Sequence, residues 1–169
     1  MLAERPTSDQ SYQTGYKNGY IAAFVDAESE FSVCVKWQDD LEFGVKLDPI
    51  FRVSQGLKRE SVLHELRTYF DCGHVRAKSG APNQKIYIVD SERELREKLV
   101  PKLDLNPPRL KFREYSGFRE IVTGWRGRKG KQDTVKLIRT AYEISGEKGK
   151  RKHSLQETLD RIDSFSGRG

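Results

Sequence analysis

Two acidic residues, Asp26 and Glu28, end a predicted helix in the stretch GYIAAFVDAESEF, residues 19–31. A carboxylate at this end faces the negative pole of the helix dipole, which costs about 0.3–1 kcal/mol at an exposed site. If the helix packs against a second copy of itself, two Glu28 side chains come close together, and such carboxylates repel one another unless they are protonated or share a cation. Oxygen ligands of this kind suit Mg²⁺, which also takes phosphate oxygens. The pattern therefore points to metal-assisted phosphodiester hydrolysis.

One face of this helix, which we expect to begin at Ser11, carries almost no side-chain bulk. Small residues recur there every four positions, and such spacing lets another backbone approach closely. Tyr16, Tyr20 and Phe24 form a bulky apolar stripe, which we expect to face the protein's own core. The residues predicted to form the interface with the second copy are Gly15, Gly19, Ala22, Ala23, Asp26 and Ala27.

Two predicted strands follow Glu28. Residues 31–38 alternate apolar and polar side chains, and residues 41–55 do the same after a turn at 39–40, which is the pattern of half-buried strands. Pro49 implies an edge or a bulge in the second of them. HVRAK and QKIYIVD predict a second hairpin of the same kind. The side chains of the first strand expected to face inward are Phe31, Val33, Val35 and Trp37.

Helices separate and follow these hairpins. One is predicted over residues 57–70, and another is capped by Ser91, has Glu94 at the capping-box position and ends near Pro101. Three more amphipathic helices are expected at about 110–124, 132–144 and 154–164. The order αββαββα, with four strands and helices behind them, predicts an α+β fold. We expect a single domain over residues 11–169, with a core (11–115) and a C-terminal helical extension (116–169), after frayed residues 1–10.

The stretch IAAFVDAES, residues 21–29, resembles the LAGLIDADG motif of intron- and intein-encoded homing endonucleases. As in that family, aromatic residues precede the motif and a strand follows it. The resemblance implies the family's αββαββα fold, with a four-stranded antiparallel saddle. One motif is present, which resembles the members that work as homodimers. The resemblance is close over roughly residues 12–115, whereas the remainder of the chain resembles the family only in its general sequence character.

The resemblance implies a site-specific DNA endonuclease that uses Mg²⁺, with Mn²⁺ or Ca²⁺ as other cations able to occupy its site. It implies cleavage of both strands of a long pseudo-palindromic target, leaving short 3′ overhangs. Glu28 matches the metal ligand of the family, and Ala27 beside it is the second candidate ligand. Gln55, Arg59 and Lys111 match residues that organise the attacking water and stabilise charge on the phosphate.

The outward faces of the strands are the predicted surface for double-stranded DNA. Side chains there would reach base edges in the major groove, and the loop before the last helix would hold phosphates. Basic residues gather toward the C-terminus, where 14 Lys and Arg stand against 5 Asp and Glu between Arg109 and His153, as on a surface that meets phosphates. The predicted DNA-contacting residues are Ser32, Cys34, Lys36, Gln38, Lys46, Asp48, Ile50, Arg52, Ser54, Arg76, Lys78, Lys85 and Tyr87, with Lys148, Lys150, Arg151 and Lys152 in the loop.

Two other interpretations stay open. Glu28 stands where the family usually has Asp, which leaves room for a non-cleaving relative, either a maturase that binds its intron RNA or a DNA-binding regulator. The small-residue helix could instead be internal packing in a monomeric enzyme of unknown type. No apolar run approaches the roughly 20 residues that span a membrane, and no secretion signal begins the chain, so we expect an intracellular protein. Cys34 and Cys72 lack metal-ligand spacing, so we expect no zinc.

Overall fold

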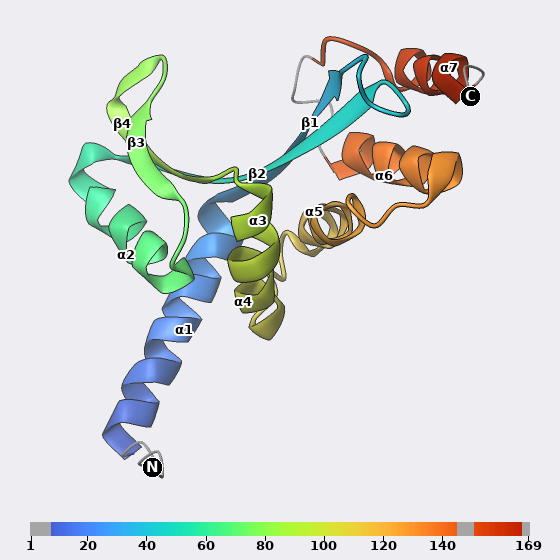
Figure 1. Ribbon diagram of the computed structural model, residues 1–169. Helices are drawn as coiled ribbons and strands as arrows, with labels where there is room; N and C mark the ends of the chain where they lie inside the picture. The colour runs from blue at the N-terminus through green and yellow to red at the C-terminus, as the bar shows by residue number, and fades with distance from the viewer. Residues whose placement is uncertain (1–7, 145–150, 167–169) are drawn as a thin grey trace.

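A four-stranded antiparallel sheet, bent into a saddle, forms the centre of the molecule, and helices cover its convex side (Figure 1). The computed structural model describes residues 8–144 and 151–166. The strands lie in the order β1-β2-β4-β3, which confirms the predicted α+β fold. Their bounds are Ser29–Trp37 for β1, Val45–Gly56 for β2, His74–Lys78 for β3 and Ala81–Val89 for β4.

The helices follow the predicted order and continue beyond the last strand. Among the described residues, no helix is long and apolar enough to cross a membrane. The elements are α1 (Ser8–Glu28), a 3₁₀ turn η1 (Leu57–Arg59), α2 (Glu60–Phe70), α3 (Glu92–Glu94), a π-turn η2 (Leu95–Leu99), α4 (Val100–Leu105), α5 (Phe112–Gly124), α6 (Gly130–Ile144) and α7 (Leu155–Ser166).

The core lies between the convex face of the sheet and the helices beneath it. Phe51 of β2 is fully buried, and its ring lies 5.3 Å from that of Phe31 and 6.0 Å from that of Phe70, measured between centroids. Phe118 of α5 extends the same cluster from the other side of Phe31. Because these rings come from β1, β2, α2 and α5, they join the two hairpins and the C-terminal helices into one core.

The prediction that Tyr16 and Tyr20 face the protein's own core is wrong. Their side chains are 68% and 42% exposed, because the N-terminal half of α1 projects away from the sheet and no other described element covers it (Figure 1). The residues of α1 that enter the core are Ile21 and Val25. The small-residue face is exposed too, at Gly15, Gly19, Ala23 and Ala27.

Two predicted helix boundaries also differ from the structure. Helix α1 begins at Ser8, so residues 8–10, predicted to be frayed, are helical, while residues 1–7 lie outside the described part of the chain. The helix that begins after Ser91 does not end at Pro101 but continues to Leu105. Pro101 has no N–H to donate, and the π-turn that precedes it widens the hydrogen-bond spacing, so the chain stays helical.

The far part of the first hairpin is a two-stranded ribbon. Strand β2 pairs with β1 from Val45 to Val53, but β4 pairs with β2 only from Phe51 onward. Pro49 therefore lies where one edge of β2 is free, as expected for a residue that cannot donate to a ladder. The ribbon reaches outward beyond the four-stranded part of the sheet.

Two glycines with left-handed backbone provide a test of how tightly the second hairpin packs. A side chain at Gly73 (φ +70) or Gly80 (φ +73) would destabilise the fold by about 1–2 kcal/mol because of this backbone conformation. A Cβ on Gly73 would also lie 2.5 Å from the carbonyl oxygen of Ile88, whereas a Cβ on Gly80 would meet nothing within 4 Å. We expect Gly73→Ala to lower the free energy of unfolding by about 1–3 kcal/mol more than Gly80→Ala. Urea unfolding of both variants checks this, and equal losses would contradict the packing described.

Candidate active site and nucleic-acid interface

The C-terminus of α1 brings two predicted catalytic residues together. Glu28, the last residue of α1, is exposed, and Gln55 Nε2 of β2 donates a hydrogen bond to Glu28 Oε2 at 3.3 Å. The Gln55 side chain is only 8% exposed, so packing fixes its direction. Glu28 therefore has one oxygen held by a buried amide and presents its other oxygen to solvent.

Asp26 anchors this end of α1 to the start of α5. Its carboxylate accepts hydrogen bonds from the backbone N–H groups of Arg109 (3.1 Å), Leu110 (2.9 Å) and Lys111 (3.2 Å). Partial burial acts to raise the pKa of Asp26, but these three donors and the charge of Lys111 outweigh it and hold the pKa below the usual aspartate value. The acid thus stands at the positive pole of α5, where a negative charge is favoured. Asp26 lines a hollow with Ala22 and Ala23, and its place in an interface with a second copy stays a prediction.

Lys111 lies directly beside the predicted metal ligands. Its Nζ donates to the carbonyl oxygen of Ala27 at 3.0 Å and also to that of Ser29. The ammonium therefore joins the end of α1 to the start of β1 and brings a positive charge close to Glu28. Arg59, also predicted to be catalytic, is exposed and lines a shallow hollow with Gln55, and no contact with Glu28 is found for it among the described residues.

A polar cleft of about 460 Å³ opens on the concave face above Glu28. Glu28 and Gln55 line it from one side, and Arg52, Lys78 and Gln84 line it from the strands. The structure thus places basic and amide side chains beside the candidate catalytic carboxylate, on the face of the sheet that the helices leave open.

The concave face of the first hairpin carries side chains held by one another. Asp48 forms ion pairs with Lys36 (2.6 Å) and Lys46 (2.9 Å), and Arg52 donates to the Ser32 hydroxyl at 2.7 Å. Burial acts to raise the pKa of Asp48, but the two ammonium groups outweigh it and lower the pKa. The register confirms that the predicted residues within the two strands share one face, since Ser32 pairs with Ile50, Cys34 with Asp48 and Lys36 with Lys46, while Ser54 follows Arg52 two positions along β2. Gln38, also predicted to contact DNA, lies just beyond the end of β1.

Two residues of the second hairpin were assigned to the wrong face. Lys85 and Tyr87 pair with Gln55 and Val53, so both point toward the helices rather than toward the concave face. Tyr87 is fully buried and its hydroxyl donates to the Cys72 carbonyl at 3.0 Å, and Lys85 lies 3.6 Å from the Glu60 carboxylate of α2. Their prediction as DNA contacts is wrong, whereas Arg76 and Lys78 lie on the concave side.

The residues that occupy the concave face in their place are Gln84, Ile86 and Ile88, together with His74 of β3 and Glu30 of β1. For Gln84, Ile86 and Ile88 the sequence carries no clear signal, because each alternating set in QKIYIVD holds two large apolar side chains. Only the pairing of β4 with β2 decides which set faces outward. The outward positions of His74 and Glu30, by contrast, follow from the alternation of HVRAK and of the first strand. Glu30, the second residue of β1, lies 3.5 Å from Arg52 and lines the same cleft as Glu28.

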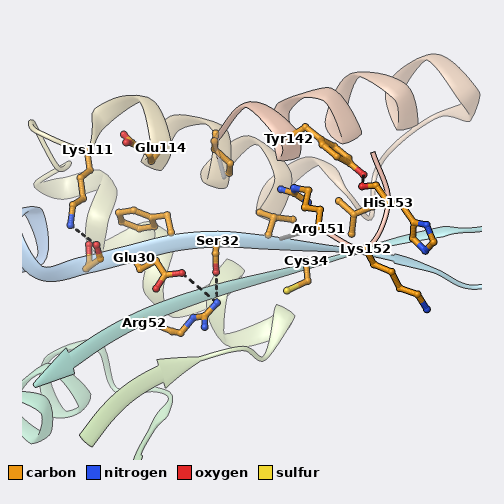
Figure 2. A pocket seen from close by; sticks show the side chains of 15 residues that line it. Glu30, Ser32, Cys34, Arg52, Lys111, Glu114, Tyr142, Arg151, Lys152 and His153 are labelled. Carbon is orange, nitrogen blue, oxygen red and sulfur yellow. Dashed lines mark hydrogen bonds and ion pairs between the residues drawn. The ribbon is translucent and has the colours of Figure 1, made fainter. Parts of the chain in front are cut away.

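A second hollow runs along the free edge of β1, between that strand and helices α5 and α6 (Figure 2). Lys111 stands at one end of it, and Lys152 and His153 stand at the other (Figure 2). Arg151 donates to the Ala141 carbonyl at 2.7 Å and lies 4.2 Å above the Tyr142 ring, and burial lowers its pKa. Arg151 is thus engaged with its own chain, and Lys152 is exposed. Lys148 and Lys150, predicted to contact phosphates, lie outside the described residues.

Comparison with known proteins agrees with this geometry. The model of the LAGLIDADG endonuclease family matches residues 21–122. Homing endonuclease I-ApeII of Aeropyrum pernix is 38% identical over 147 residues, covering 83% of this chain and 87% of that protein. The chain therefore belongs to the LAGLIDADG endonuclease family, and the predicted resemblance is confirmed. It is an endonuclease, as that resemblance implied.

Solved structures share the arrangement of strands and helices. The archaeal intron-encoded homing endonuclease I-Vdi141I, determined in complex with DNA, is 35% identical and matches with a TM-score of 0.82 over 90% of this chain and 98% of that one. The group I intron-encoded homing endonuclease I-CeuI, also complexed with DNA, shares the fold at 19% identity, with a TM-score of 0.75 over 95% of this chain and 79% of its own.

The anchor between α1 and α5 predicts a pH-dependent contribution to stability. A carboxylate whose pKa is lowered in the folded state stabilises that state above the ordinary aspartate pKa, and this contribution is lost as pH falls through the lowered value. Asp26→Asn keeps one acceptor oxygen but loses the charge, so we expect it to lower the free energy of unfolding at pH 7 by about 1–2 kcal/mol. Urea unfolding at pH 7 and pH 3 checks this: the difference from the unaltered protein should shrink at pH 3, and a constant difference would contradict it.

Proposed function

We propose that the protein is a homodimeric, Mg²⁺-dependent, site-specific DNA endonuclease that cuts both strands of a long pseudo-palindromic target and leaves short 3′ overhangs. The observation that carries this proposal is the exposed Glu28 carboxylate, oriented by Gln55 and flanked by Lys111, at the border between an open small-residue helix face and the concave face of the sheet. Because the proposed target is double-stranded DNA, we expect the protein to act inside the cell.

The surface beside α1 supports assembly with a second copy. A Cβ added at Gly15 or Gly19 would meet nothing within 4 Å, so this face is open in the single chain. Three large apolar side chains between the end of α4 and the start of α5 are also exposed, namely Leu105 (76%), Leu110 (82%) and Phe112 (58%). Leu105 and Phe112 line the hollow next to Ala22 and Ala23. An apolar rim beside a bare helix face suits an identical chain that supplies the same pair of features.

The donors at the end of α1 suit Mg²⁺. A carboxylate oxygen of Glu28 and the carbonyl oxygen of Ala27 are hard oxygen ligands, and Mg²⁺ takes one or two such protein ligands together with waters and phosphate oxygens. In the described part of the chain, no three His, Cys, Asp or Glu side chains gather where they could hold a metal. In one chain the carboxylates that line the cleft at this place are those of Glu28 and Glu30, and a second copy would bring another Glu28.

Each nearby residue then has a distinct task. Gln55 orients the Glu28 carboxylate, and Lys111 brings a positive charge toward the reacting phosphate while it holds the Ala27 and Ser29 carbonyls. When bound, the metal supplies Lewis-acid stabilisation of charge on the phosphate. Arg59, at the rim beside Gln55, is placed to approach the DNA backbone.

The concave face suits duplex DNA. Polar and basic side chains on β1 and β2 are in position to meet base edges, and Arg76 and Lys78 extend the same surface across the second hairpin. A two-fold arrangement of two saddles would present each half of the target with the same residues, which favours a pseudo-palindromic sequence. The structures of I-Vdi141I and I-CeuI in complex with DNA support this assignment.

The catalytic assignment predicts a separation of cleavage from binding. Glu28→Gln removes the charge that holds the metal while the side-chain shape is kept. Mutation of a residue that merely supports a metal ligand lowers metal affinity or activity by about 10–100-fold. We therefore expect this variant, which alters the ligand itself, to cleave a duplex that spans the intron-free insertion junction (the junction duplex) at least about a hundredfold more slowly. Binding, measured by mobility shift in Ca²⁺, should change little. Glu65→Gln on the exposed side of α2 is the control, and retained cutting by Glu28→Gln would remove the assignment.

The interface assignment predicts a monomer that still folds. Gly19→Leu fills open space on α1 and raises helix propensity by about 0.5–1 kcal/mol, so the single chain should not be destabilised. We expect it to shift sedimentation equilibrium toward monomer and to reduce cleavage. Lys17→Leu places the same side chain on another side of α1 and serves as the control. Unchanged self-association of Gly19→Leu, or a monomeric unaltered protein, would contradict the proposed dimer.

A further inference from the structure

The two-stranded ribbon of β1 and β2 needs support from outside the sheet. Strand β4 pairs with β2 only from Phe51 onward, so the part that carries Lys36 and Lys46 has no third strand. A hairpin without further strands is marginally stable in water. Yet this part presents several of the charged side chains on the concave face, and their direction depends on how firmly the ribbon is held.

The side chain of Trp37, the last residue of β1, is held between two residues of the C-terminal extension. The His153 ring stacks on it at a centroid distance of 3.5 Å and an interplanar angle of 8°. The guanidinium of Arg161, on α7, lies 4.7 Å from the centre of the same indole. Because side chains alternate along a strand, fixing Trp37 on the helix side fixes Lys36 on the other side. Gln38 lies just beyond β1, where its backbone N–H donates to the Gly44 carbonyl at 2.9 Å.

Arg161 also holds both ends of the turn at the tip of the ribbon. Its Nε donates to the Gly44 carbonyl at 2.8 Å, and its Nη2 pairs with the Asp39 carboxylate. The Arg161 side chain is only 16% exposed, and its guanidinium lies 4.7 Å from the Phe165 ring. A mostly buried guanidinium that satisfies a carbonyl, a carboxylate and two rings defines one geometry, because its planar fork is rigid.

The extension itself is tied to the rest of the helices. The Tyr142 hydroxyl of α6 lies 2.9 Å from the His153 carbonyl oxygen and shares a hydrogen bond with the Thr158 hydroxyl at 2.8 Å. Helix α6 packs against α5, where Ile144 contacts Gly117 so closely that a Cβ on this glycine would lie 2.3 Å away. The ribbon tip is therefore connected, through α7 and α6, to the core.

The tip lies far from the candidate catalytic end of α1. From Ser29 to Trp37 the strand advances eight residues, which corresponds to about 26 Å at about 3.3 Å per residue. At about 3.4 Å per base pair, this spans about eight base pairs of duplex. Residues at the tip would thus meet the outer part of each half-site, while Glu28 stands near the centre.

Resting on the proposed DNA endonuclease function, we propose that Arg161 is a positioning residue for specificity: by holding Trp37 and the turn at residues 39–44, it aims Lys36, Gln38 and Lys46 at the outer base pairs of each half-site. Arg161 itself lies on the helix side of the ribbon and is not placed to touch the target. The C-terminal helices are then part of the recognition apparatus, although they lie behind the sheet.

The test uses the full-length chain, the junction duplex in Mg²⁺ and a set of duplexes that differ from it by one base pair at each position. Discrimination against a wrong outer pair, of about tenfold in the unaltered protein, should fall to about twofold in Arg161→Ala. Discrimination at the central pairs should stay unchanged. Asp163→Asn, which breaks only the surface ion pair between Lys131 and α7, is the matched control and should keep the original profile at every position.

If Arg161 had a purely structural role, Arg161→Ala would reduce cleavage equally for all the duplexes, in proportion to the fall in melting temperature. That result would overturn the proposal. Unchanged outer discrimination in Arg161→Ala overturns it as well. If Arg161→Ala does not fold, Arg161→Lys keeps the charge beside Asp39 but cannot hold the Gly44 carbonyl at the same time, and the same selective relaxation is required of it. Absence of cutting by the unaltered protein would instead remove the proposed function on which this inference rests.

Discussion

Three backbone N–H groups at the start of α5 converge on the Asp26 carboxylate, and the placement of the candidate active site depends on this contact. An acid in the last turn of α1 is unfavourable for α1 alone, but the same acid accepts three hydrogen bonds from residues 109–111, just ahead of the positive pole of α5. The conflict seen in the isolated helix is thus resolved between two elements. Because the end of α1 is fixed there, Glu28 is held beside Gln55, and Lys111 is brought against the Ala27 and Ser29 carbonyls.

The saddle divides its two faces between different tasks. Its convex face builds the core with rings from β1, β2, α2 and α5. Its concave face carries polar side chains that already contact one another, such as Arg52 with Ser32 and Asp48 with its two lysines. Contacts of this kind lower the number of conformations available to long side chains, so less entropy is lost when they bind.

The features that could be predicted from the sequence are those written in local patterns. The first hairpin has a clear alternation of apolar and polar residues, and its outward set is correct. The second hairpin has two apolar sets, so the register with β2, which no local pattern encodes, decided the face of Lys85 and Tyr87. Helix periodicity identified the stripe of Tyr16 and Tyr20 but could not show that no other described element covers it.

Contacts between distant parts of the chain were the features that the sequence hid. Nothing near Trp37 indicates that Arg161 will lie over its ring, and nothing near Asp26 indicates the backbone of residues 109–111. The resemblance to a family supplied Gln55 and Lys111 as candidates, and the structure places both beside the end of α1. Their roles in the reaction stay predictions.

The ion pairs of Asp48 have a further consequence for binding to a polyanion. Lys36, Lys46 and Asp48 together carry one net positive charge rather than two. The steepness with which affinity for DNA falls with salt reflects the counterions that basic residues displace from the phosphates. A surface whose lysines are already partly neutralised displaces fewer of them. We therefore expect the affinity of this surface for DNA to depend less on ionic strength than the number of its basic residues suggests.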